Sequence, residues 1–400
     1  MRSIQAVPVL TRRTLLLGMV GSVAQMTGCG GAGSDVAGLS SGGTGSFTSG
    51  TISGLGSIIV NGIRYNDDNA SLISRDDGLS FGGPLKVGMV VSIQGSSVIA
   101  ATTINGTATA TAYRISSGSE WQGPVSNIGV TSFDVLGLTV DVLASTVFEG
   151  AATQLAGLIT SYFVEVHGYV DQTTGHLQAS RVDVSTSAPT FYKLSGVVNS
   201  FDAGNRTFKL GAAAQHSSQM SWDTNTVLPV SWSDGVFVRV TVTPLLLATQ
   251  IRLPTSPLAQ LNAQDEHDAE IHGFISAYQS NANFTVNGIP VDASNARIAG
   301  GTLALGVRVE IHGSISNGIL VATQVETQSN NDVALHEFEF HGVISALNVT
   351  AQTFVLHGLT FGYDNGTILY GVSMANGARI EIKATRSSGV WRATEIRADD

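Results

Sequence analysis

Charged residues and cysteine are both scarce in this sequence. Only 12% of its 400 residues are charged, against about 25% in an average soluble domain. Lys, Glu and Gln do not recur in the long runs that amphipathic helices need on their exposed face, so the composition argues against a helical bundle. The single cysteine, Cys29, excludes an internal disulfide, because a lone thiol has no partner within the chain.

Basic residues are fewer than acidic ones. The chain has 20 Lys and Arg against 30 Asp and Glu, a formal charge of −10, and no basic run follows residue 13. Binding to nucleic acid needs clustered Lys and Arg that neutralise phosphates. We therefore expect no nucleic-acid partner.

Glycine, in contrast, is abundant, with 46 residues, and it is accompanied by many Ser, Thr, Val and Ala. Glycine permits tight turns, and β-branched residues favour strands. Val, Ile, Leu and Phe recur often enough to fill several small cores. The composition therefore predicts an all-β protein.

The first 28 residues have the features of an export signal. Arg12 and Arg13 stand directly before an apolar segment that ends at Gly28. This segment is too short to cross ~30 Å of hydrocarbon. The arginine pair resembles a twin-arginine signal, and the general secretory route stays open as the alternative.

The cysteine after this segment is the predicted site of lipid attachment. Met26-Thr27-Gly28-Cys29 resembles a bacterial lipobox, in which small residues precede the cysteine that receives lipid. Residues 29–46 form a Gly/Ser tether that has nothing to bury. The sequence thus predicts a signal peptide at 1–28 and an exported lipoprotein of the cell envelope that is anchored to the membrane. Gly30, in place of Asp, favours the outer membrane.

From residue 47 onward the chain repeats with a period of about 70 residues. Each copy has an early strand with a glycine, a hairpin, an alternating strand such as residues 303–313, and a closing strand, in that order. The early glycines are Gly50, Gly123, Gly196, Gly273 and Gly342. Because these four features recur in the same order, the sequence predicts five β repeats, at residues 47–117, 118–187, 188–253, 254–330 and 331–400. The third repeat diverges most from the others.

Each copy has the pattern of two β-hairpins. Asn61-Gly62 and Asn287-Gly288 stand between short alternating runs, and both residue types tolerate the positive φ that a two-residue hairpin turn needs. In residues 303–313 the alternation sends Val309 and Ile311 to one face of the strand. An open sheet of five short strands would expose its edges, so we expect each copy to close into a small β-barrel and to pack against its neighbours.

Residues 50–65 and 85–95, together with the lipobox and the tether, resemble bacterial repeat lipoproteins of the Domain of Unknown Function 5666 family. The resemblance extends from residue 47 to about residue 397 and is strongest in the first and fourth copies. It implies a tandem array of small barrels similar to the oligonucleotide/oligosaccharide-binding (OB) fold. It implies no activity, no cofactor and no catalytic residues.

A Glu-x-His-Gly motif is the strongest candidate for site chemistry, and it occurs four times. The pairs are Glu165/His167, Glu270/His272, Glu310/His312 and Glu339/His341. Residues two apart on a strand point the same way, so each pair projects from one face. Imidazole and carboxylate suit Zn²⁺ or a similar ion if three or four ligands converge, and pairs on adjacent strands could meet. The alternative is that they are solvent-facing residues beside a turn glycine.

Trp222 and Trp232, in the divergent third repeat, are the candidate residues for stacking on a sugar. Aromatic residues of small barrels also fill cores, and that alternative stays open. The aspartates after the hairpins have no EF-hand spacing and fit Asx-turns better than a calcium site.

No motif in a fitting context supports catalysis. Residues 38–42 match the Gly-x-Ser-x-Gly nucleophile elbow, but a tether supplies neither the buried strand nor the helix that the elbow requires. The sequence predicts a non-catalytic, lipid-anchored envelope protein that acts as a binding or spacer module, without a cofactor, for a polysaccharide or another envelope protein. Two alternatives remain: a glycan-binding lipoprotein that uses Trp222 and Trp232, and a metal-dependent envelope enzyme that uses the Glu-x-His pairs.

Overall fold

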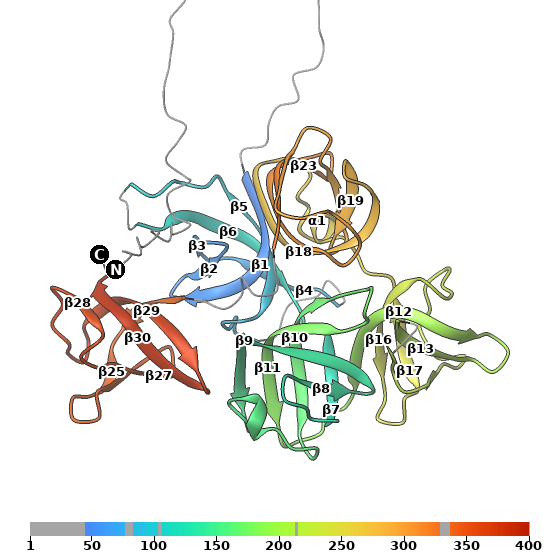
Figure 1. Cartoon of the computed structure of the whole chain (residues 1–400), viewed down its shortest axis with the longest axis horizontal. Coiled ribbons are helices and arrows are strands. Elements are labelled where there is room, and N and C mark those ends of the chain that lie inside the picture. The colour runs from blue at the N-terminus through green and yellow to red at the C-terminus, as the bar shows by residue number, and fades with distance from the viewer. Residues whose placement is uncertain (1–44, 77–82, 103–105, 213–214, 329–336, 400) are drawn as a thin grey trace, which may run out of the picture. The chain divides into compact units, whose positions relative to one another are not determined.

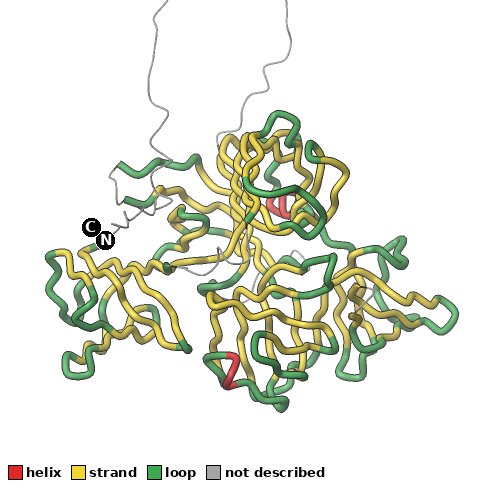
Figure 2. Tube along the Cα trace, viewed as in Figure 1, coloured by secondary structure: helices red, strands yellow, loops and turns green. Residues whose placement is uncertain are grey.

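A computed structural model describes residues 45–76, 83–102, 106–212, 215–328 and 337–399. The predicted signal peptide, Cys29 and residues 38–42 lie outside the described residues. Strands dominate the described part, and helix is confined to two short segments (Figure 2). Within this part, no helix has the length and apolar character needed to cross a bilayer.

The first repeat is a closed barrel. Its strands are β1 (Gly45–Leu55), β2 (Ile58–Val60), β3 (Ile63–Asn66), β4 (Ser71–Ser74), β5 (Val90–Ser96) and β6 (Ala108–Ser117). β1 pairs antiparallel with β2, β2 antiparallel with β3, and β3 parallel with β6. β5 then pairs antiparallel with both β6 and β1, so the pairing returns to its start. This is the closed Greek-key order of an OB-like barrel.

The other repeats contain equivalent strands. Repeat 2 has β7 (Trp121–Ser126), β8 (Ser132–Val135), β9 (Leu138–Gly150), the 3-10 helix η2 (Leu155–Gly157), β10 (Phe163–Val170) and β11 (Leu177–Ser185). Repeat 3 has β12 (Tyr192–Asp202), β13 (Thr207–Ala212), β14 (Gln215–His216), β15 (Met220–Ser221), β16 (Phe237–Val242) and β17 (Ala248–Arg252).

Repeat 4 begins with α1 (Pro257–Leu261) and continues with β18 (Glu266–Ser280), β19 (Asn283–Val286), β20 (Ile289–Asp292), β21 (Arg297–Ala299), β22 (Arg308–Ser316) and β23 (Ile319–Thr327). Repeat 5 has β24 (Phe338–Val343), β25 (Ser345–Asn348), β26 (Thr353–Leu356), β27 (Leu359–Gly362), β28 (Ile368–Tyr370), β29 (Arg379–Ser387) and β30 (Val390–Ala398). In Figure 1, β27, β30 and β29 lie side by side in this last barrel, in agreement with their pairing.

The other repeats close into barrels by the same kind of strand pairing as repeat 1. The parallel contact between the third strand and the closing strand recurs as β9–β11, β20–β23 and β27–β30. In repeat 3, isolated parallel bridges at Ser221–Leu247 and Val227–Gln250 take its place. The expected all-β array of small OB-like barrels is therefore confirmed.

The hairpin turns and the alternating pattern behave as the sequence indicated. Asn61-Gly62 and Asn287-Gly288 all have positive φ, between 49° and 81°, which matches the twist of the flanking strands. Val309 and Ile311 are fully buried in the core of repeat 4. Burying side chains of this size stabilises the fold by about 1.5–3 kcal/mol each.

Contacts between repeats go beyond chain neighbours, which the sequence did not indicate. Ser46–Ser49 of β1 pair in parallel with β18 of repeat 4, and Gly54 and Leu55 at the other end of β1 pair with β24 of repeat 5. At these positions one edge of β1 pairs with β5 or β2 of its own barrel, and the N–H and C=O groups of its other edge find partners on other repeats. Repeats 2 and 3 share one core, and buried Trp121 donates from Nε1 to the carbonyl oxygen of Ser195 at 2.8 Å.

Candidate metal centre

Two Glu-x-His pairs meet on the outer face of repeat 4. β18 and β22 run antiparallel in a register that places Glu270 opposite His312, and His272 opposite Glu310. Ile271 and Ile311 lie between them and point into the core, so alternation sends all four polar side chains outward. We call Glu270, His272, Glu310 and His312 the repeat-4 quartet.

The four side chains of the quartet lie within direct reach of one another. His272 Nε2 is 3.1 Å from Glu270 Oε1 and 3.7 Å from Glu310 Oε2. His312 Nε2 is 3.0 Å from Glu310 Oε1, and its Nδ1 is 3.8 Å from Glu270 Oε2. Each imidazole thus faces both carboxylates.

The hairpin of the same repeat fixes the backbone at this site. A Cβ at Gly273 would lie 1.9 Å from Asn287 Nδ2, so only glycine leaves room for this side chain. Asn287 uses that space to donate from Nδ2 to the carbonyl oxygen of His272 at 3.2 Å. Repeat 1 has the same device, in which Asn61 approaches Gly50 and donates to the carbonyl oxygen of Ser49. The early glycine and the Asn-Gly turn are therefore parts of one structural unit.

The electrostatics of the quartet favour a bound cation. The hydrogen bond with Glu310 raises the pKa of His312, and the charges of Glu270 and Glu326 add to this against the opposing effect of burial. Gln328 Nε2 donates to Glu310 Oε2 at 2.9 Å and helps to hold that carboxylate. A field that attracts a proton to the imidazole also attracts a metal ion that replaces the proton.

The donor set suits a transition metal. Ligand atoms of Glu270, Glu310 and His312 all lie within 4.8 Å of one another. Two imidazoles and two carboxylates offer the nitrogen and oxygen donors that Zn²⁺, Ni²⁺ and Cu²⁺ accept. The structure brings these four predicted residues together as the sequence spacing indicated, and metal binding itself stays a prediction.

The pair in repeat 5 meets different partners. His341 lies opposite Glu381, and Glu339 lies opposite Lys383, which takes the place of His312. His341 also contacts Asp399. Sequence reasoning missed Glu381 because Lys383 breaks the Glu-x-His pattern. An alignment of the repeats on their turn glycines would have found it, because Glu381 then coincides with Glu310.

The pair in repeat 2 joins no such group among the described residues. Glu165 lies opposite Gln122 on one side and opposite Asp183 on the other, and Asp183 already pairs with Lys86 and Arg181. His167 is only 1% exposed, and neither of its ring nitrogens has a hydrogen-bond partner within the described structure. Burial lowers the pKa of His167 to about 4, so the ring is neutral.

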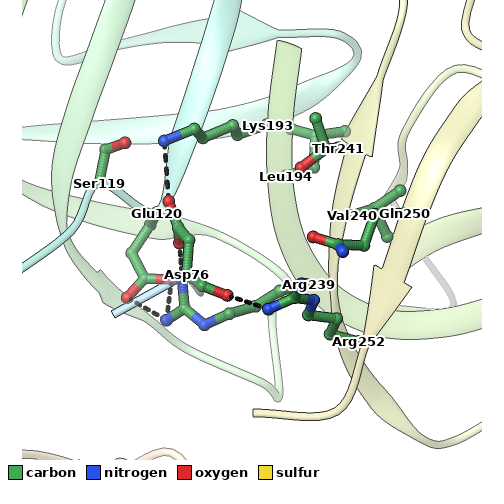
Figure 3. A pocket seen from close by; sticks show the side chains of 10 residues that line it. All are labelled: Asp76, Ser119, Glu120, Lys193, Leu194, Arg239, Val240, Thr241, Gln250 and Arg252. Atoms are coloured by element: carbon green, nitrogen blue, oxygen red, sulfur yellow. Dashed lines mark hydrogen bonds and ion pairs between the residues drawn. The ribbon is translucent and has the colours of Figure 1, made fainter. Parts of the chain in front are cut away.

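A buried ionic network lies near His167 and was also missed from the sequence. Glu120 is 2.7 Å from Arg75 Nη2. It is also 3.0 Å from Arg239 Nη2 (Figure 3). Burial would raise the pKa of Glu120, but these two arginines and Ser195 outweigh it and lower the pKa to about 2. Asp76 is 2.7 Å from Lys193 Nζ in the same network.

The network around Glu120 connects repeats and leaves little room for a ligand. The cavity that Figure 3 shows has a volume of about 20 Å³, enough for one water molecule. Its charged residues come from repeats 1, 2 and 3 and already pair with one another. We therefore assign the network a structural role.

The two tryptophans of repeat 3 contribute to its core. The ring of Trp222 stacks on Phe201 with centroids 5.3 Å apart, and Trp232 contacts Trp222 edge to face at 4.9 Å. Trp222 is buried and Trp232 is half-buried. A sugar could stack on the covered face of Trp222 only by displacing Phe201, so the packing favours the core alternative for these residues.

Comparison with known proteins agrees with the repeat structure. The domain of unknown function DUF5666 matches residues 122–183, 272–326 and 341–397. These segments lie in repeats 2, 4 and 5; the first repeat, where we expected a strong resemblance, is not among them.

No curated protein sequence matches the chain. Among solved structures, Drosophila Unr CSD456 matches at 12% identity over 53% of this chain and 98% of that chain, with a TM-score of 0.14. The matched family carries no assigned catalytic activity. Three segments of the chain, in its second, fourth and fifth repeats, thus match the DUF5666 domain family.

Proposed function

We propose that this chain is a non-catalytic binding protein of the cell envelope, held there by a lipid on Cys29, and that its fourth barrel binds a divalent transition-metal ion. The proposal rests above all on one observation, the convergence of Glu270, His272, Glu310 and His312 from two paired strands. Sites built on strands hold their ligands more precisely than sites on loops.

The donor set argues for binding. Ligand atoms of Glu270, Glu310 and His312 all lie within 4.8 Å of one another, and His272 Nε2 lies 3.1 Å from Glu270 Oε1. Structural zinc sites have four protein ligands, whereas catalytic sites have three and keep one position for water or substrate. We propose that His272 joins the other three residues as the fourth ligand, which favours a binding module over the metal-dependent enzyme.

Metal retention by the full chain tests the proposal. After dialysis against Zn²⁺, Ni²⁺ or Cu²⁺ and then against metal-free buffer, the His272→Gln/His312→Gln double variant is expected to retain one ion per chain fewer than wild type. His267→Gln is the matched control, because His267 lies on the same strand as His272, is exposed, and pairs with the neighbouring Asp268. Equal retention by wild type and the double variant would contradict the proposal.

A further inference from the structure

A second group of potential ligands lies on β24 and β29 of repeat 5. Glu339, His341 and Glu381 occupy the positions that Glu270, His272 and Glu310 occupy in repeat 4. Ligand atoms of these three residues all lie within 4.8 Å of one another. His341 Nε2 is 2.9 Å from Glu339 Oε1. Three of the four donor positions of the quartet are thus present again.

Asp399 orients the histidine of this group from the other side. Asp399 Oδ1 is 2.9 Å from His341 Nδ1, and both side chains are only 4% exposed. Asp399 is in turn held by Arg379 Nε at 2.9 Å and by Arg64 Nη1 at 3.6 Å. A histidine that binds a metal usually donates its second ring N–H to a carboxylate, which fixes the tautomer and the ring orientation. His341 has this arrangement, with Nε2 directed at the other two ligands.

Lys383 removes the fourth donor. It stands where His312 stands in repeat 4, and its Nζ lies 3.3 Å from Glu337 Oε2 and 3.9 Å from Glu395 Oε2. Its ammonium group is therefore engaged by carboxylates outside the three ligands. One imidazole and two carboxylates then leave coordination positions that water can fill.

Neighbouring side chains compete with an ion for these ligands. Thr107 Oγ1 donates to Glu339 Oε1 at 3.1 Å, and Arg397 Nε lies 3.7 Å from Glu381 Oε1. Burial opposes protonation of His341, but its hydrogen bonds with Glu339 and Asp399 outweigh this and raise its pKa. Nε2 and Nδ1 of His341 lie 2.9 Å from Glu339 Oε1 and from Asp399 Oδ1, so an ion at Nε2 has to displace the contact with Glu339.

We infer that the fifth barrel holds a second site for a divalent transition-metal ion, made by Glu339, His341 and Glu381, with Asp399 as the positioning residue for the histidine. The ion binds at His341 Nε2. The Nδ1 proton remains in its hydrogen bond with Asp399. The site differs from the repeat-4 quartet in having three donors and a buried imidazole, and it does not depend on that quartet.

Zinc retention by the full chain separates the two sites. On the His272→Gln/His312→Gln background, the chain is expected to retain one Zn²⁺, and further substitution of His341→Gln or, separately, Glu381→Gln is expected to remove it. Asp364→Asn is the matched control, since Asp364 is an exposed carboxylate of repeat 5 that pairs with Arg392. Unchanged circular dichroism verifies the fold, and the half-buried Glu381 provides a milder variant than His341.

Each outcome decides between the sites. If the background variant retains no zinc, or retains its ion after the repeat-5 substitutions, the second site is refuted while the proposed function stands. Retention of two ions by the background variant would instead refute the site in repeat 4.

The role of Asp399 is tested by affinity. Asp399→Asn is expected to weaken zinc binding on this background by about 10–100-fold without changing the stoichiometry. Asp399→Glu, which keeps a carboxylate beside His341, is expected to recover part of this affinity. Unchanged affinity in Asp399→Asn, or no recovery in Asp399→Glu, would contradict the arrangement.

Discussion

At the scale of single residues, the same motif leads to different results in different repeats. His312 and His167 each stand two residues after a glutamate and directly before a glycine. His312 is 41% exposed and faces two carboxylates, whereas His167 is 1% exposed and has no hydrogen-bond partner within the described residues. His167 is buried among charged groups of its own repeat and Arg75 of repeat 1. A ligand motif therefore identifies a site only where other ligand side chains meet it.

Buried His167 predicts sensitivity of stability to acid. Its pKa in the folded chain is about 4, against 6.5 for the ordinary side chain. The folded state disfavours protonation of His167. The stability that depends on a neutral ring is therefore fully present above pH 6.5 and is lost as the pH falls from 6.5 to 4. The loss is on the order of 3 kcal/mol. Charged groups around the ring are Asp183, Arg75, Arg181 and Glu120.

Urea unfolding of wild type and His167→Leu at pH 7 and pH 4.5 measures this contribution. The variant is expected to be as stable as wild type or more stable at pH 7, because it removes an unpartnered buried polar group. It is also expected to lose less stability at pH 4.5. An identical pH dependence in the two chains would show that His167 does not titrate as the structure implies.

At the scale of elements, the repeating unit is the early strand with its hairpin. Glycine has to stand at 273 because Asn287 occupies the space of its missing Cβ. Asn287 in turn adopts a φ of 49° in the turn between β19 and β20. Both features were visible in the sequence, but their contact was not, because thirteen intervening residues separate them. Local turn chemistry and strand alternation could therefore be predicted, and the reason for their joint recurrence could not.

Gly273→Ala tests this contact. The added methyl group collides with Asn287 and breaks its hydrogen bond with the carbonyl oxygen of His272, so we expect a loss of about 1–3 kcal/mol in the free energy of unfolding. Adding Asn287→Gly should recover part of that loss, since the substitution removes the collision and glycine tolerates the positive φ of this position. Strictly additive effects in this double-mutant cycle would show that the two residues do not interact.

At the scale of the whole molecule, five barrels contact one another through their strands and ion pairs. The sequence indicated the barrels because each is encoded by local alternation and turns. It did not indicate the pairing of β1 with β18 and β24, or the network around Glu120, since these join residues that are far apart in the chain. The site in repeat 4 was within reach of the sequence, because its residues belong to two strands of one barrel.

The proposed lipid anchor predicts a change in the location of the whole protein. Cys29→Ser is expected to abolish incorporation of labelled fatty acid and to move the chain from the membrane fraction to the soluble fraction of the envelope. Ser34→Ala, in the tether, is the control and should leave both unchanged. Undiminished labelling of the Cys29→Ser chain would contradict the anchor, because no other cysteine is present.

Anomalous X-ray diffraction tests the central claim most directly. Data collected on either side of the zinc absorption edge, from crystals of the full chain grown with Zn²⁺, locate the ion without reference to any variant. The account predicts an anomalous peak about 2.0–2.2 Å from imidazole nitrogens of His272 and His312 and from carboxylate oxygens of Glu270 and Glu310. A zinc-loaded crystal with no peak between β18 and β22 would contradict it.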